Sequence, residues 1–136
     1  MQKLQSLAND LNIAHLVTFT SWIKEVDWAL AGLDIVCLTS FNEGTPVSLI
    51  EAQAANKPIV STYVGGIENS VIPNKTALLA DINDINAYNS LLLQLIKSPQ
   101  LRQAMGSAGW ELVKDKFHFK RLVSDTRNLY YSLLNS

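Results

Sequence analysis

The chain has 136 residues, of which 48% are hydrophobic and 17% are charged, and its 11 Lys and Arg against 12 Asp and Glu give a formal net charge of -1. This composition is typical of a globular protein and excludes an intrinsically disordered chain, and the length suits one domain over residues 1–136. The charge balance excludes an overall electrostatic attraction to nucleic acid or to an anionic membrane.

The helix and strand signals of the first third alternate. Apolar residues at spacings of three and four predict an amphipathic helix over residues 3–12, and β-favouring residues predict a short strand at 15–19. A second helix is expected from about residue 23 to a stop at Gly32, followed by a strand over 34–38.

The central segment contains the clearest helix boundaries. Pro46 suits the first position of a helix, which makes Thr45 the expected N-cap, and Asn56 is expected as a left-handed residue at the helix end. Strands are predicted at residues 58–61 and, less clearly marked, at 76–80.

The last third is predicted to be helical. Asp84 is expected to cap one helix, Ser98 and Pro99 to open a second one that ends near Lys116, and residues 117–134 to form the last. The residues expected on the buried face of the last helix are Phe119, Leu122, Val123, Leu129, Tyr130, Leu133 and Leu134.

We expect structural roles for two glycines and one histidine in the last third of the chain. Gly106 and Gly109 should either weaken their helix or let it approach a neighbour closely. His118 precedes the last helix at the position of its cap.

The alternation of strands and helices predicts an α/β fold, a Rossmann-like parallel sheet flanked by helices. Four strands make a small sheet, and the chain starts with a helix, so we expect the first strands of the fold to lie upstream.

The chain has a single cysteine, Cys37, inside an apolar run, where a buried and inert thiol is expected. One cysteine forms no disulfide within the chain, no signal peptide is evident, and no apolar run reaches the ~18 residues of a membrane span. The expected location is cytoplasmic.

The strand at 34–38, the following loop and the helix at Pro46 form the junction that binds anions in open α/β sheets. Glu43 on the loop and Glu51 on the helix are eight residues apart. A diphosphate could lie at the helix start, ~7–8 Å from the backbone of Glu51, whose carboxylate can accept hydrogen bonds from two ribose hydroxyls. Glu43 would then face a sugar at the other end of the ligand.

The segments Asn42–Ala52, Ala55–Thr62 and Val64–Ile67 together resemble family-four glycosyltransferases, which have the GT-B fold. Glu43 and Glu51 match the E-x7-E motif of that family, and the resemblance covers nearly the whole chain as the C-terminal, donor-binding half. It implies that a nucleotide-sugar, a UDP- or GDP-sugar, is the donor for transfer of a hexosyl group to a glycan or lipid-linked acceptor, with retention of configuration, as in polysaccharide biosynthesis.

The resemblance assigns roles by position. Glu43 would be the catalytic-site residue that contacts hydroxyls of the donor sugar, and Glu51 would hold the ribose. No metal and no other cofactor is expected. The other expected donor-binding residues are Gly44, Thr45, Pro46, Val47 and Ser48, and base or loop contacts are expected from Thr20, Ser21, Gly65 and Gly66.

The sequence departs from the family at two places. Thr45-Pro46 stands where Phe-Gly is frequent, which removes one backbone N–H, and Ser21 stands where a glycine is usual. The glycine-rich loop, the basic pair for the diphosphate and the acceptor-binding domain of the family would all lie upstream, so we expect no turnover from these 136 residues alone. Association with a membrane would come through that missing domain, and the exposed apolar surface should favour self-association.

Other interpretations remain open. Glu43 and Glu51 could be solvated surface charges, Gly65 and Gly66 could be turn residues that need a positive φ, and the three tryptophans (Trp22, Trp28 and Trp110) are expected to be packing residues. The alternative functions are a non-catalytic nucleotide-sugar-binding module and a GT-B sugar-nucleotide epimerase.

Overall fold

The computed structural model describes residues 2–135. Its described part contains a parallel sheet of three strands in the order β1-β2-β3, with β1 at Val36–Leu38, β2 at Ile59–Thr62 and β3 at Ala77–Ala80. Val36 pairs with Ile59, and Ile59 pairs with Ala77, so the three strands start level with one another. The predicted parallel α/β sheet is confirmed.

The strand predicted at residues 15–19, the first of the four in chain order, is wrong. The chain forms a short 3-10 turn there, η1 (Ala14–Leu16), and Val17 that follows is extended. In the described sheet β2 occupies the middle, and residues 15–19 pair with none of the three strands. The local β propensity of these residues has no partner strand to stabilise it.

Two hydrophobic cores lie on opposite faces of the sheet, because neighbouring residues of a strand point to opposite sides. Ile59 and Ala77 pack with Leu30 of α2 (Val26–Ala31) and Leu49 of α3 (Val47–Ala54). On the other face, β2 and β3 pack against two helices, α4 (Ile85–Lys97) and α5 (Pro99–Lys116). The residues of this second core are Val60, Leu78, Leu95 and Met105.

The helix boundaries of the last third follow the predicted caps. The Asp84 side chain accepts from Ala87 N at 2.8 Å, and the Ser98 hydroxyl accepts from Leu101 N at 3.2 Å. The His118 ring accepts from Lys120 N at 3.1 Å, at the start of α6 (Phe119–Leu134). These caps are confirmed because each needs only a side chain and a backbone N–H a few residues away.

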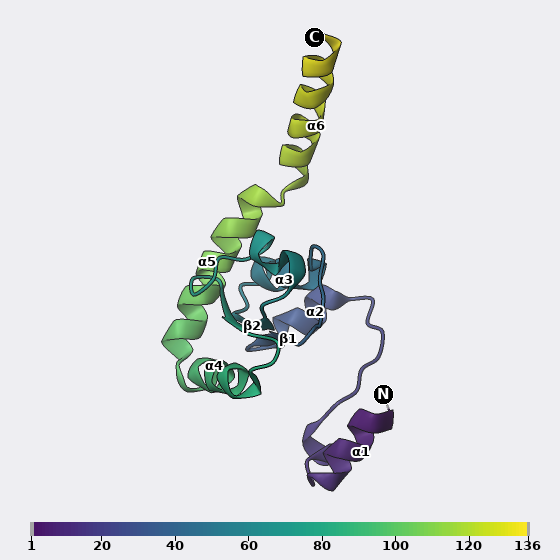
Figure 1. Ribbon diagram of the computed structural model, residues 1–136, viewed down its shortest axis with the longest axis vertical. Coiled ribbons are helices and arrows are strands. Elements are labelled where there is room, and N and C mark those ends of the chain that lie inside the picture. The colour runs from purple at the N-terminus through teal and green to yellow at the C-terminus, as the bar shows by residue number, and fades with distance from the viewer. Residues whose placement is uncertain (1, 136) are drawn as a thin grey trace.

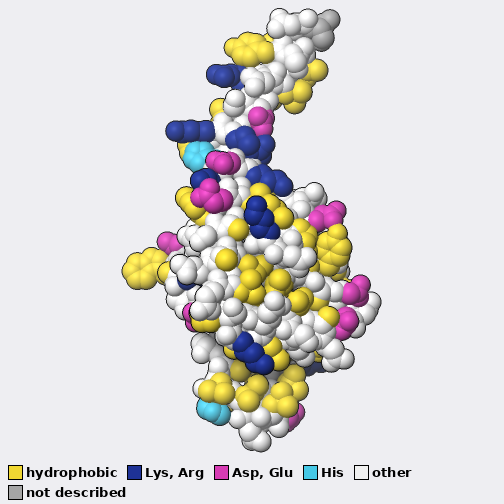
Figure 2. Space-filling model, turned by 90° about the vertical axis from the view of Figure 1, so that its left-hand side faces the viewer, with side chains coloured by type: hydrophobic (Ala, Val, Ile, Leu, Met, Phe, Trp, Pro, Cys, Tyr) yellow, Lys and Arg dark blue, Asp and Glu magenta, His cyan; other side chains and the backbone are white. Residues whose placement is uncertain are grey.

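Helices α1 (Gln2–Asp10) and α6 both stand away from the sheet (Figure 1). No residue of α6 is buried, so the buried face predicted for this helix is wrong. Leu122 is 64% exposed and Tyr130 is also 64% exposed. Figure 2 shows hydrophobic side chains exposed along this projecting helix.

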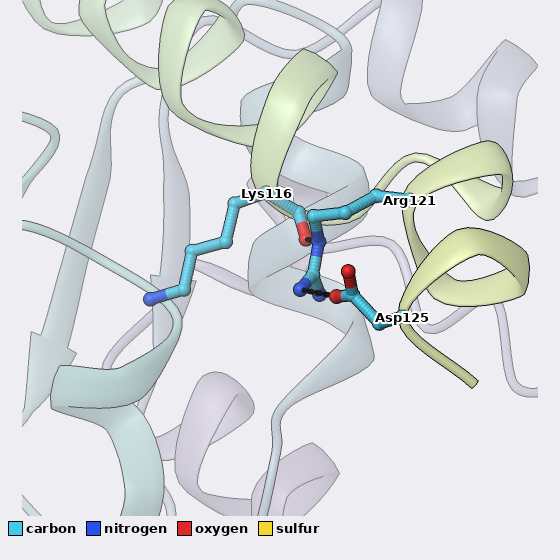
Figure 3. Close-up of polar contacts among 3 residues, drawn as sticks. All are labelled: Lys116, Arg121 and Asp125. Carbon is cyan, nitrogen blue, oxygen red and sulfur yellow. Dashed lines mark hydrogen bonds and ion pairs between the residues drawn. The ribbon is translucent and has the colours of Figure 1, made fainter. Parts of the chain in front are cut away.

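Arg121 joins α6 to the end of α5 (Figure 3). Its Nε donates to the Lys116 carbonyl oxygen at 2.6 Å, and its Nη1 donates to Asp125 Oδ2 at 2.7 Å. The Lys116 ammonium points the other way and donates to the Asn69 carbonyl oxygen at 2.6 Å. The contacts to Lys116 and Asn69 satisfy carbonyl groups at the ends of α5 and η2, where intrahelical partners are lacking.

Several predicted packing residues are exposed instead. Cys37 is exposed on β1, an edge strand, and its predicted burial is wrong. Trp22 is 85% exposed, Trp28 79% and Trp110 43%, so none of the three packs inside a core. Among the helices that the structure describes, none has the length and apolarity needed to cross a membrane.

Candidate functional site

The candidate site lies where β1 and β2 end, at the carboxyl edge of the parallel sheet. The β1–α3 loop (residues 39–46) carries Glu43, and the β2–η2 loop leads into η2 (Gly65–Asn69). In a parallel α/β sheet, ligands bind outside this edge.

The two loops are bonded to each other. Thr62, at the end of β2, donates its hydroxyl to the Ser40 carbonyl oxygen at 2.7 Å, and Gly66 N donates to the Glu43 carbonyl oxygen at 2.8 Å. The Ser40 hydroxyl donates to Glu43 Oε1 at 2.6 Å. The carboxylate of Glu43 is thus half-buried and held from within its own loop.

Gly65 and Gly66 are needed because this approach is too close for a side chain. A Cβ on Gly65 would lie 2.0 Å from the Glu43 carbonyl oxygen, and one on Gly66 would lie 2.0 Å from the Gly44 carbonyl oxygen. Gly65 has φ +52°, as expected for a turn glycine, whereas Gly66 has φ -86°. The predicted positive φ is confirmed at Gly65 and is wrong at Gly66.

The start of α3 differs by one residue from the prediction. Pro46 is the N-cap rather than the first helical residue, with φ -73° and ψ 98°, and the predicted cap from the Thr45 side chain is wrong because no side chain caps this helix. Pro46 is buried, while Thr45, Val47 and Ser48 are exposed. The first N–H groups of α3 therefore belong to Val47 and Ser48, at the positive end of the helix dipole.

Glu51 is the fifth residue of α3 and is exposed. It borders a groove of about 380 Å³ between α2 and α3, whose other lining residues are Val26, Asp27, Leu30, Ala31, Ala54 and Ala55. The two charged residues of this lining, Asp27 and Glu51, are both acidic, so the groove favours a partly apolar group that carries hydroxyl donors over a phosphate.

The other predicted contacts are less closely gathered. Glu43 and Gly44 lie with Gly65 and Gly66, while Glu51 belongs to the α2–α3 groove. Thr20 and Ser21 are exposed, and neither lines that groove. Ser21 has φ +56°, a conformation that favours glycine, which gives a physical meaning to the glycine expected there.

Sequence reasoning missed three residues of this region: Ser40, Thr62 and Asp27. The signal for Ser40 was its place three residues before Glu43, a spacing at which a serine hydroxyl can reach a neighbouring side chain. Nothing local pointed to Thr62, which reaches Ser40 only because β1 and β2 are paired.

No group of three or more His, Cys, Asp and Glu side chains in residues 2–135 is arranged to hold a metal ion. The absence of a metal from the reaction stays a prediction.

The family profile described as glycosyl transferases group 1 matches residues 1–111. The chain belongs to this family. Among curated relatives, the N-acetyl-alpha-D-glucosaminyl L-malate synthase of Bacillus anthracis is 30% identical over 128 residues, which are 94% of this chain and 34% of the relative. The D-inositol 3-phosphate glycosyltransferase of Corynebacterium jeikeium is 34% identical over 108 residues, which are 78% of this chain and 26% of the relative.

Two solved structures illustrate the similarity in fold. The sucrose-phosphate synthase of Thermosynechococcus elongatus has a TM-score of 0.88 and 25% identity, covering 98% of this chain and 34% of that one. HepE of Anabaena, solved in complex with UDP-glucose, has a TM-score of 0.83 and 18% identity, covering 99% of this chain and 36% of that one. Glycosyltransferase family membership and the Rossmann-like GT-B fold are therefore confirmed, for a chain that spans about a third of the length of these relatives.

Proposed function

We propose that this chain is the donor-binding part of a group 1 glycosyltransferase, which binds a UDP- or GDP-sugar for transfer of a hexosyl group to a glycan or lipid-linked acceptor. The observation that carries the proposal is the placement of Glu43 at the carboxyl edge of the sheet, followed by the start of α3 and, along the same helix, by Glu51 at the α2–α3 groove. HepE, which has the same fold, was solved with UDP-glucose.

The nucleoside would enter the α2–α3 groove. Its apolar walls suit the faces of a base, and the Glu51 carboxylate can accept from both ribose hydroxyls. The diphosphate would lie at the start of α3, near the N–H groups of Val47 and Ser48, where the helix dipole stabilises negative charge.

The donor sugar would lie against the β1–α3 loop. Glu43 would accept from sugar hydroxyls. Gly44 and Thr45 are both exposed, and a Cβ on Gly44 would meet nothing within 4 Å, which leaves room for the sugar and the diphosphate to approach. Transfer with retention of configuration, without a metal, in the cytoplasm and with an acceptor-binding domain upstream, belongs to the same proposal.

Calorimetry with UDP and with GDP tests the nucleotide site. Glu51→Ala should weaken binding about tenfold or more, because a hydrogen bond to a charged group contributes ~1.5–3 kcal/mol. Glu111→Ala is the matched control, since it removes an exposed carboxylate on α5 that pairs with Lys114. Unchanged affinity in Glu51→Ala, or an equal loss in both variants, would contradict the ribose role.

Turnover separates the transferase from a non-catalytic binding module. We expect no transfer from these 136 residues and transfer from a chain that also carries an acceptor-binding domain. Robust transfer by the 136 residues alone would contradict the proposal that catalysis needs an additional acceptor-binding domain.

A further inference from the structure

Two backbone points of the β1–α3 loop are fixed, one by the last residue of β2 and one by η2. Thr62, only 7% exposed, donates its hydroxyl to the Ser40 carbonyl oxygen at 2.7 Å. Three residues further along the loop, the Glu43 carbonyl oxygen accepts from Gly66 N at 2.8 Å. The backbone between Ser40 and Glu43 is thus anchored at both ends, at one end to the last residue of β2 and at the other to η2.

The Glu43 side chain is fixed as well. Its Oε1 accepts from the Ser40 hydroxyl at 2.6 Å, and no other side chain of the described residues bonds this carboxylate. One carboxylate oxygen is therefore held by the loop, while Oε2 remains for a ligand hydroxyl.

The absence of side chains at Gly65 and Gly66, which face this loop, lets the geometry form. Gly65 and Gly66 bring their backbone so close that a Cβ on either would lie 2.0 Å from the carbonyl oxygen of Glu43 or of Gly44. The bonds from Ser40, Thr62 and Gly66 thus act on one short segment, and together they restrict the rotamers of the Glu43 side chain before any ligand arrives.

We propose that Ser40 and Thr62 are positioning residues that aim the Glu43 carboxylate at the donor sugar. Ser40 acts on the carboxylate directly, and Thr62 acts through the backbone of Ser40. The inference rests on the proposed function. It concerns only the gain from the sugar, which is the factor by which a nucleotide-sugar binds more tightly than its nucleoside diphosphate.

The test measures that added part. Calorimetry on the full chain compares each nucleoside diphosphate with its sugar derivative: UDP with UDP-glucose and UDP-N-acetylglucosamine, and GDP with GDP-mannose. The pair with the largest gain from the sugar is then used for the variants Ser40→Ala, Ser40→Thr, Thr62→Val and Glu43→Gln. Ser90→Ala is the matched control. The Ser90 hydroxyl also donates to an oxygen, the Asn86 carbonyl oxygen at 2.8 Å, but it lies on the exposed side of α4.

We expect Ser40→Ala to reduce the gain from the sugar by about five- to tenfold, because the carboxylate loses the hydrogen bond that orients it but keeps its own bond to the ligand. Binding of the bare nucleoside diphosphate should stay as in the unmodified chain. Ser40→Thr should restore the gain, Thr62→Val should reduce it less than Ser40→Ala does, and Ser90→Ala should leave it unchanged.

Three results would overturn the inference. If Ser40→Ala leaves the gain from the sugar unchanged, the Ser40 hydroxyl does not position the carboxylate. If Ser40→Ala weakens binding of the nucleoside diphosphate and of its sugar derivative equally, the substitution has loosened the loop in general. If the unmodified chain binds UDP or GDP but binds none of the sugar derivatives more tightly, Glu43 does not contact the donor sugar. The proposed nucleotide site would remain supported by that result. If the chain binds neither UDP nor GDP, the proposed function is contradicted, and the inference that rests on it is contradicted as well.

Discussion

Gly106 of α5 lies directly against the backbone of Asn56: a Cβ on Gly106 would be 2.1 Å from the Asn56 carbonyl oxygen. Asn56 follows the end of α3 in a left-handed conformation, with φ 57°. Three residues further along α5, a Cβ on Gly109 would be 2.9 Å from Gln53 Cγ. The two glycines thus let α5 pack closely against the C-terminal half of α3, the helix that carries Glu51.

Gly106→Ala should destabilise the fold by about 3 kcal/mol, because backbone atoms rather than a flexible side chain block the added methyl group. Denaturant titration measures the change. Gly32→Ala is the control, since the nearest atom to its Cβ is 3.6 Å away and its φ is -81°, so we expect no loss, or a gain of about 0.5 kcal/mol. Equal stability of the two variants would show that α5 can shift away from Asn56 at little cost.

Ser21→Gly should stabilise the chain by about 0.5–1 kcal/mol. Ser21 has φ +56°, where a residue with a Cβ costs ~1–2 kcal/mol more than glycine, partly offset by the greater chain entropy of glycine. Ser107→Gly, the same change inside α5, should destabilise by about 0.5–1 kcal/mol. Thermal or denaturant unfolding that gave both variants the same sign would contradict the role of backbone conformation.

Alkaline pH should destabilise the fold through Tyr88. Burial, and then the neighbouring Cys37, raise the pKa of Tyr88 above its usual value near 10. Because the folded state binds this proton more tightly than the unfolded chain, the stability due to Tyr88 is complete below pH ~10 and declines as pH rises above it.

Urea titrations from pH 8 to pH 11 check this dependence. Tyr88→Phe should lose about 1 kcal/mol at pH 8, because Tyr88 OH donates to the Val60 carbonyl oxygen at 3.2 Å, but it should decline less steeply above pH 10. Tyr131→Phe, an exposed position on α6, controls for the loss of one phenol group. The same alkaline decline in Tyr88→Phe as in the unmodified chain would exclude Tyr88 as its source.

The exposed apolar face of α6 and the open edge of β1 should make the chain self-associate. Sedimentation velocity over a range of concentrations measures this. Leu122→Lys combined with Tyr130→Lys should shift the chain toward monomer, because both side chains belong to the apolar face.

Asn128→Lys combined with Ser132→Lys adds the same charge to exposed polar positions of α6 and is the control. A larger effect of this control pair would point to net charge rather than to the apolar face, and a strictly monomeric unmodified chain would contradict the prediction.

The amino-acid sequence by itself determined those features that depend on neighbours in the chain. Asp84, Ser98 and His118 cap their helices as predicted, and the left-handed Asn56 was foreseen, because each depends on a side chain or a backbone conformation within a few residues. The Glu43 and Glu51 pair was also found in the sequence, and its role in donor binding stays a prediction.

The tertiary structure decided those features that depend on what lies opposite. Residues 15–19 have strand propensity but no partner strand, and α6 has an apolar face but no surface to cover it in the described chain. Cys37 is exposed because α4 covers β2 and β3 on that face of the sheet rather than β1. Two hydrogen bonds form only when β1 and β2 pair and bring two distant loops together: the bond from Thr62 to Ser40 and the bond from Gly66 to Glu43. Propensity and capping are local energies that a sequence displays, whereas burial and contact between distant loops depend on surfaces that only the folded chain creates.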